Sequence, residues 1–104
     1  MSEAETTALL ALQLQCTARI TTANGSKYLQ RLCKHFAHKV RANWDENRGQ
    51  VIFAEGVCTL EADVLGLQLI CSAASQQDLM DIVDTMDRHF IRFAKAEAPE
   101  LNWQ

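Results

Sequence analysis

Residues 50–72 read QVIFAEGVCTLEADVLGLQLICS, and this stretch decides the fold class. It contains three short runs rich in apolar and β-branched residues, which are typical of strands. The turn formers Glu55-Gly56 and the residues 63–66 separate these runs, and both connections suit hairpins. We therefore predict three antiparallel strands, at residues 50–54, 57–62 and 67–72. Their inward-facing side chains are predicted to be Val51, Phe53, Cys58, Leu60, Ala62, Leu67, Leu69 and Cys71.

A fourth strand and a helix are predicted ahead of these three strands. Residues 12–20 alternate between apolar and polar side chains over nine positions, which indicates a half-buried strand whose inward side chains are Leu12, Leu14, Cys16, Ala18 and Ile20. A helix then begins near Ser26 and is predicted to run to about Ala42, because apolar residues recur at helical spacing. That apolar stripe consists of Tyr28, Leu29, Leu32, Cys33, Phe36 and Val40.

A loop and a second helix complete the predicted order of elements. Residues 43–49 are rich in turn formers and predict a loop, with Trp44 as its anchor in the core. Ser75 and Asp78 have the spacing of a helix-capping box, so a second helix is predicted to begin there and to run to about Ala94 or Ala96. Its buried stripe is predicted to consist of Leu79, Ile82, Val83, Met86, Phe90 and Phe93.

The order strand, helix, three strands, helix predicts an α+β fold. It is expected to be a two-layer sandwich, in which a four-stranded, mostly antiparallel sheet carries both helices on one face. The length of 104 residues fits one domain, at residues 12–104, with residues 1–11 as a flexible N-terminal segment. The tail that holds Leu101 and Trp103 is expected to dock back on this domain.

The composition predicts a cytoplasmic protein that does not enter a membrane. No stretch approaches the roughly 20 consecutive apolar residues of a membrane span. The first residues carry no basic group before a short apolar run, so they do not resemble a secretory signal. No two of the four cysteines have the C-x-x-C spacing, and each falls on an apolar stripe, which predicts buried thiols rather than disulfides or a zinc site.

Charge is distributed unevenly along the chain. Residues 1–44 carry six basic and two acidic groups, whereas residues 45–104 carry four basic and eleven acidic groups. No carboxylate occurs between Thr6 and Trp44. Such an asymmetry is informative about partners rather than about the fold.

The densest cluster of functional side chains is the octapeptide LCKHFAHK at residues 32–39. On a helix, its outward residues join a basic face that consists of Lys27, Arg31, Lys34, His38 and Arg41. This face predicts a binding module for an anionic small molecule or an acidic protein. Nucleic acid is not favoured as the partner, because no aromatic residues alternate with the basic ones as a base-stacking surface requires. A plain solvated helix face is the alternative to a binding site.

A metal site that uses His35, His38 and His89 is a second hypothesis. His35 and His38 are three residues apart and can approach one point on a helix. Cys33 points about 200° away from His35 around that helix, so it is not expected to share an ion with the histidines. With four strands, both helices would run in the same direction along the sheet, which argues against contact between His35 and His89.

Catalysis has no support from motifs, since the chain lacks a nucleophile elbow, a Gly-rich phosphate loop and an HExxH sequence. We therefore expect a non-catalytic protein without a required cofactor. The sheet face left uncovered by the helices carries polar and β-branched residues, including Arg19, Glu61 and Ile70. That mixture allows a third hypothesis, in which the protein is a homodimeric interaction domain working through this face.

The chain resembles a small bacterial family of domains of unknown function. The resemblance depends on the motif Leu-Cys-Lys-His-x-x-His-Lys at residues 32–39, and on Gly-x-Cys-x-Leu-Glu-Ala at residues 56–62. It also includes His-x-x-Arg-Phe-Ala at residues 89–94 and a terminal Trp103. Similar domains occur fused to siderophore-interacting proteins, so the resemblance implies a link to iron or siderophore handling. It also adds Arg92 to the predicted ligand-binding residues, which are Arg31, Lys34, His35, His38 and Arg92.

Overall fold

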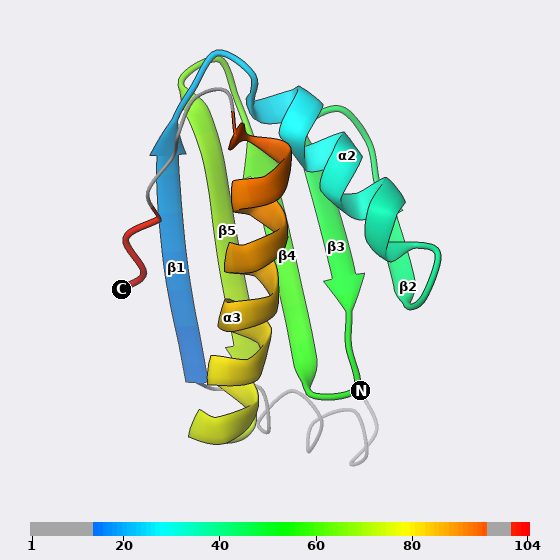
Figure 1. Cartoon of the computed structure of the whole chain (residues 1–104), viewed down its shortest axis with the longest axis vertical. Coiled ribbons are helices and arrows are strands. Elements are labelled where there is room, and N and C mark those ends of the chain that lie inside the picture. The colour runs from blue at the N-terminus through cyan, green and yellow to red at the C-terminus, as the bar shows by residue number, and fades with distance from the viewer. Residues whose placement is uncertain (1–13, 96–100) are drawn as a thin grey trace, which may run out of the picture.

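In its described residues, the protein is a two-layer α+β sandwich in which two helices cover one face of a single sheet (Figure 1). The computed structural model describes residues 14–95 and 101–104. The expected flexible segment 1–11 and the first inward strand residue, Leu12, lie outside this part. The elements are β1 (Leu14–Thr21), α2 (Gly25–Phe36), β2 (Arg41–Trp44), β3 (Arg48–Ile52), β4 (Gly56–Ala62), β5 (Gly66–Ala73) and α3 (Gln76–Phe93).

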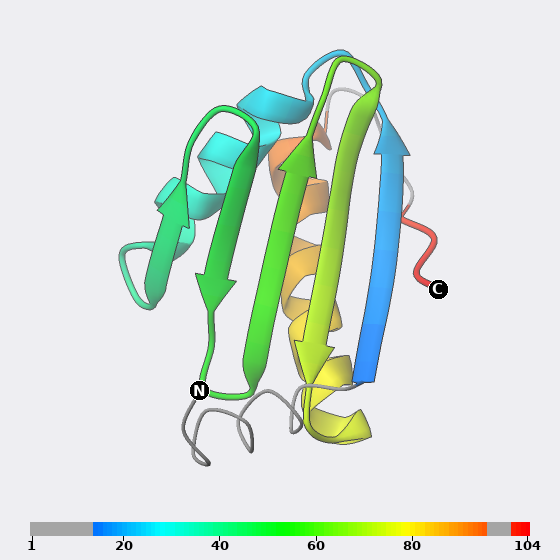
Figure 2. The same cartoon turned by 180° about the vertical axis from the view of Figure 1, so that it is seen from behind.

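The sheet has five strands rather than the four that we predicted, in the order β1-β5-β4-β3-β2. All four pairs of neighbouring strands are antiparallel. The predicted hairpins are present, and the three strands start within two residues of their predicted positions. Seen from behind, the other face of the sheet carries no helix in the described part of the chain (Figure 2).

The fifth strand, β2, forms where we predicted the last turn of a helix and the start of a loop. The helix α2 ends at Phe36, and the backbone N–H groups of Lys39 and Val40 then both donate to the Phe36 carbonyl and turn the chain back. Ala42 pairs with Val51 of β3, so pairing with an open sheet edge outweighs the helical pattern. Trp44 is 39% exposed at the end of β2, and its prediction as a core anchor was wrong.

The extra strand reverses the direction of every later element relative to α2. Because each strand runs opposite to its neighbour, one inserted strand reverses the direction in which α3 runs along the sheet. Figure 1 shows α2 descending obliquely from the top of the sheet while α3 ascends from the bottom. The prediction that both helices run in the same direction was therefore wrong, and the flanks of the two helices face each other.

The core lies between the helices and the sheet, and three of its cysteines lie side by side across it. Cys16, Cys71 and Cys58 are direct partners on β1, β5 and β4. Cys33 of α2 packs onto the same core. All four are free thiols; Cys33, Cys58 and Cys71 are buried, which confirms the prediction for them, whereas Cys16 is half-buried. Leu14, which we expected to face inward, is 38% exposed at the end of β1.

The second helix and the tail follow the prediction closely. The Ser75 side chain accepts a hydrogen bond from the backbone N–H of Asp78 and caps α3. At the C-terminus, Trp103 donates from its indole N–H to Asp87, and the backbone of Gln104 exchanges two hydrogen bonds with Thr17 of β1. The docked tail thereby covers part of the outer edge of β1. In the part of the chain that the structure describes, neither helix combines the length and the apolar character needed to cross a membrane.

Packing of α2 against β3 depends on Gly49, because a Cβ atom there would lie 2.6 Å from the Cys33 sulfur and 3.2 Å from Leu29 Cδ2. We predict that Gly49→Ala lowers the free energy of unfolding by about 1–3 kcal/mol, as overpacking usually does. In a Cys33→Ala background, which removes the nearer atom, the loss should be smaller. Urea denaturation of the four proteins measures this coupling. An equal loss in both backgrounds would show that Cys33 and Gly49 are not in contact.

Candidate functional site

The helix α2 has two chemically different sides. Leu29, Leu32 and Cys33 are fully buried against the sheet, whereas His35, and His38 in the turn that follows the helix, are exposed. The rotation of about 200° between Cys33 and His35 is therefore present as predicted. In the octapeptide at residues 32–39, the thiol therefore faces the core and the imidazoles face solvent, so these groups do not form one site.

Aromatic and imidazole rings from the last turn of α2 meet rings from the C-terminal part of α3. The His35 ring centroid lies 5.1 Å from that of His89, 5.4 Å from that of Phe93 and 5.5 Å from that of Phe36. The Phe36 ring in turn lies 4.8 Å from His89 and 5.4 Å from Phe53. We call these five residues the ring cluster. The prediction that His35 and His89 do not meet was wrong, because it assumed helices that run in the same direction.

The tautomer of His89 follows from its hydrogen bond. Its Nδ1 atom lies 2.7 Å from the backbone carbonyl oxygen of Thr85, one turn earlier in α3. A carbonyl oxygen can only accept, so Nδ1 carries the proton and donates it. In the neutral ring the other nitrogen, Nε2, is left as an acceptor.

A cationic pocket lies beside the ring cluster, with a volume of about 290 Å³. It is lined by Arg31, Lys34, His35, His38 and Phe93. Four of these five residues can carry positive charge, and no carboxylate lines the pocket. The volume is near the lower end of the range for small-molecule sites. The geometry therefore suits a small anion that has an apolar part to place against Phe93.

The cations of this pocket are not neutralised within the described residues. The ion pairs in residues 14–95 and 101–104 are Arg48 with Glu61 and Arg88 with Asp84, and neither includes a residue of α2. Two further carboxylates of α3 have other partners: Asp81 accepts from Gln77, and Asp87 accepts from Trp103. The positive charge of the pocket therefore faces solvent.

The structure brings together four of the five predicted ligand-binding residues. Arg92 is exposed and does not line the pocket, although it lies close enough for its charge to act on His35. Arg41, which we placed on the basic helix face, belongs instead to β2. Phe93 was assigned only to the buried stripe of the second helix, and its role as a pocket wall became visible only when α3 was placed against α2.

The metal hypothesis receives less support from the geometry. Among the residues that the structure describes, no three His, Cys, Asp or Glu side chains are arranged to hold a metal ion. His35 and His89 are neighbours, but the set His35, His38 and His89 does not converge on one point. The arginine and lysine side chains around the pocket would also repel a cation.

The thiols are poorly suited to nucleophilic chemistry. Burial raises the pKa of Cys33 to about 11. The pKa of Cys58 is raised well above its usual value by its contact with Cys71 and by burial. Because the thiolate is the reactive form, these cysteines are expected to be inert at neutral pH.

His35 should titrate at a lower pH in the folded protein than in a peptide. Partial desolvation lowers its pKa, and the charges of His89, His38, Arg92 and Lys39 lower it further. The unfolded chain, with a His pKa of about 6.5, then binds more protons than the folded one, so unfolding free energy should fall as pH drops below about 6.5. An NMR titration of the imidazole measures the pKa directly. His35→Gln should flatten the pH dependence of urea denaturation; a His35 pKa at or above the peptide value would contradict this account.

Comparison with known proteins supports the fold and identifies the family. The solved NMR structure of PA4090 from Pseudomonas aeruginosa is similar, with a TM-score of 0.75 and 27% sequence identity over 88% of this chain and 96% of that one. A search of curated proteins gave no match. The model of the family described as uncharacterised protein conserved in bacteria, DUF2218, matches residues 17–104. Since this match spans most of the sequence and includes both helices and the ring cluster, the chain belongs to the DUF2218 family.

Proposed function

We propose that this protein is a non-catalytic binding module for a small organic anion, which it holds in the cationic pocket between α2 and α3. The observation that carries the proposal is the lining of the pocket, where Arg31, Lys34, His35 and His38 surround one space without an acidic neighbour. Hydrogen bonds between such cations and a carboxylate or phosphate are about twice as strong as neutral ones.

Phe93 and the ring of His35 favour an anion that also has a flat apolar part. Their ring centroids are 5.4 Å apart at an interplanar angle of 70°, so the two rings form an angled wall at one side of the pocket. An aromatic carboxylate could place its ring against this wall and its carboxylate toward Arg31 and Lys34. Arginine is well suited to this contact because its planar guanidinium can donate two parallel hydrogen bonds.

Benzoate is a suitable probe, with benzamide as its uncharged analogue. In an NMR titration we expect benzoate to shift the signals of Arg31, Lys34 and Phe93, and benzamide to bind about tenfold more weakly or not at all. Bound benzoate should also raise the pKa of His35, because an anion beside an imidazole favours its protonated form. Binding should weaken as salt is added.

Arg31→Glu tests the role of the pocket, and Lys27→Glu is its matched control. Lys27 lies one helical turn earlier on α2, is exposed, and does not line the pocket. Arg31→Glu should weaken benzoate binding about tenfold or more, since it removes a charge-assisted hydrogen bond and adds a repulsive charge. Lys27→Glu makes the same change of net charge and should have only a small effect. Equal losses in the two variants would refute a defined site on α2.

The other proposals have less support from the arrangement of side chains. An acidic protein could use the same cations, but the small volume of the pocket and its aromatic wall favour a small molecule. A homodimer through the open sheet face would have to bury several polar side chains, since one row across it contains Thr17, Thr59, Gln50 and Asn43, with Ile70 as its apolar member. An iron chelator is itself an organic anion, so a link to iron or siderophore handling is compatible with the proposal.

A further inference from the structure

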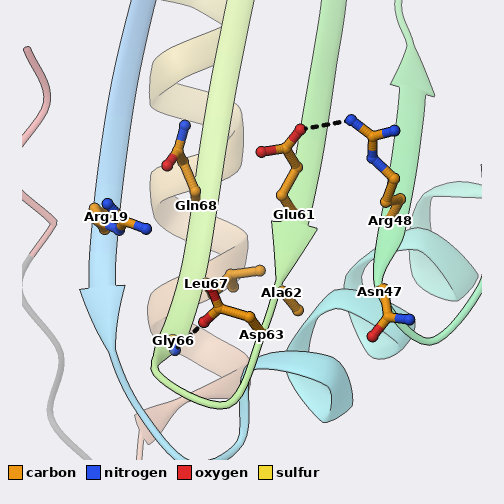
Figure 3. A pocket seen from close by; sticks show the side chains of 9 residues that line it. All are labelled: Arg19, Asn47, Arg48, Glu61, Ala62, Asp63, Gly66, Leu67 and Gln68. Carbon is orange, nitrogen blue, oxygen red and sulfur yellow. Dashed lines mark hydrogen bonds and ion pairs between the residues drawn. The ribbon is translucent and has the colours of Figure 1, made fainter.

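A second pocket lies on the open face of the sheet, opposite the helices and near the turn between β4 and β5 (Figure 3). It has a volume of about 300 Å³. Four of its lining residues form one row across four neighbouring strands. Arg19 of β1 pairs with Gln68 of β5, Gln68 with Glu61 of β4, and Glu61 with Arg48 of β3. The register of the sheet therefore fixes the order cation, amide, anion, cation.

One side of this row is already paired. A guanidinium nitrogen of Arg48 lies 2.9 Å from Glu61 Oε1, and the contact is drawn in Figure 3. The Arg48 side chain is 74% exposed and that of Glu61 is 39% exposed. The second carboxylate oxygen of Glu61, Oε2, makes no hydrogen bond with any described residue. Glu61 therefore keeps an acceptor while Arg48 holds it in place.

The other side of the row has donors without partners. Within the described residues, Arg19 makes no side-chain hydrogen bond or ion pair, and neither does Gln68. Asp63 is the second acid that lines the pocket. Its Oδ1 atom accepts hydrogen bonds from the backbone N–H groups of Leu65 and Gly66 and stabilises the turn between β4 and β5. The row thus offers a ligand a guanidinium with an adjacent amide at one end and a carboxylate oxygen at the other.

We propose that this pocket binds a small zwitterion of the amino-acid class, separately from the anion site on the helices. Its carboxylate would accept from the guanidinium of Arg19 and the side-chain amide of Gln68, and its ammonium group would donate to Glu61. Arg19 and Glu61 are two strand spacings apart, about 9.6 Å, with Gln68 between them. A hydrogen bond of about 2.8 Å at each end takes up part of this span, so the charged ends of the ligand must be roughly 4–5 Å apart. An ω-amino acid of four carbons has charged ends at such a separation, whereas a simple anion satisfies only half of the row.

γ-Aminobutyrate is the probe, because butyrate and butylamine each lack one of its two charged groups. In NMR titrations we expect γ-aminobutyrate to shift the signals of Arg19, Glu61 and Gln68. Each single-charge analogue should bind about tenfold more weakly, which corresponds to the loss of one charge-assisted hydrogen bond. Butyrate binding as tightly as γ-aminobutyrate would show a plain anion site and overturn the proposal. The absence of any shift at these residues would also overturn it.

Two variants with one matched control locate the site. Arg19→Gln and Glu61→Gln should each weaken γ-aminobutyrate binding about tenfold. Arg41→Gln removes the same charge from the same sheet face but lies outside the pocket, so it should leave binding unchanged. A similar loss in Arg41→Gln would overturn the proposal. Arg31→Glu should also leave γ-aminobutyrate binding unchanged, which separates this site from the one on the helices.

Discussion

The end of α2 at Phe36 is the constraint on which the rest of the structure depends. The Phe36 carbonyl accepts from both Lys39 and Val40, and this turn allows the next residues to pair with β3 as a fifth strand. The fifth strand reverses the sense of the later elements, so that α3 runs against α2 rather than along it. Only this arrangement brings His89 and Phe93 against the last turn of α2.

That contact between the two helices gives the protein its distinctive chemistry. The inner side of α2 supplies Leu29, Leu32 and Cys33 to the core, where burial keeps the thiol protonated. The outer side supplies a row of cations that no described carboxylate neutralises. Since α3 adds aromatic rings but no acid at this contact, the site combines positive charge with an apolar wall. The proposed anion binding depends on this combination, whereas the row on the open sheet face contains a carboxylate, Glu61, between Arg48 and the Gln68–Arg19 pair.

Much of the fold could be predicted from sequence. Apolar residues that recur every second position mark the buried face of a strand, and those that recur about every 3.6 positions mark the buried face of a helix. The hairpins in residues 48–73, the capped helix α3 and the separation of Cys33 from His35 all follow from such patterns. The strand β2 could not be predicted in the same way, since residues 41–44 show no clear strand pattern and form one by pairing with an available edge. Four site residues were found from their spacing on one helix. The role of Phe93 and the contact between His35 and His89 could be found only from the relative direction of the two helices. Our prediction of that direction was wrong because it lacked one strand.

Contact between the rings of His35 and His89 tests the central claim most directly. These rings lie 5.1 Å apart only if β2 is present and α3 runs opposite to α2. Nuclear Overhauser measurements on selectively labelled histidine side chains would detect that proximity. The account predicts clear cross-peaks between the ring protons of His35 and those of both His89 and Phe93. If His35 showed cross-peaks only to residues of its own helix, the helix arrangement and the site built on it would be wrong.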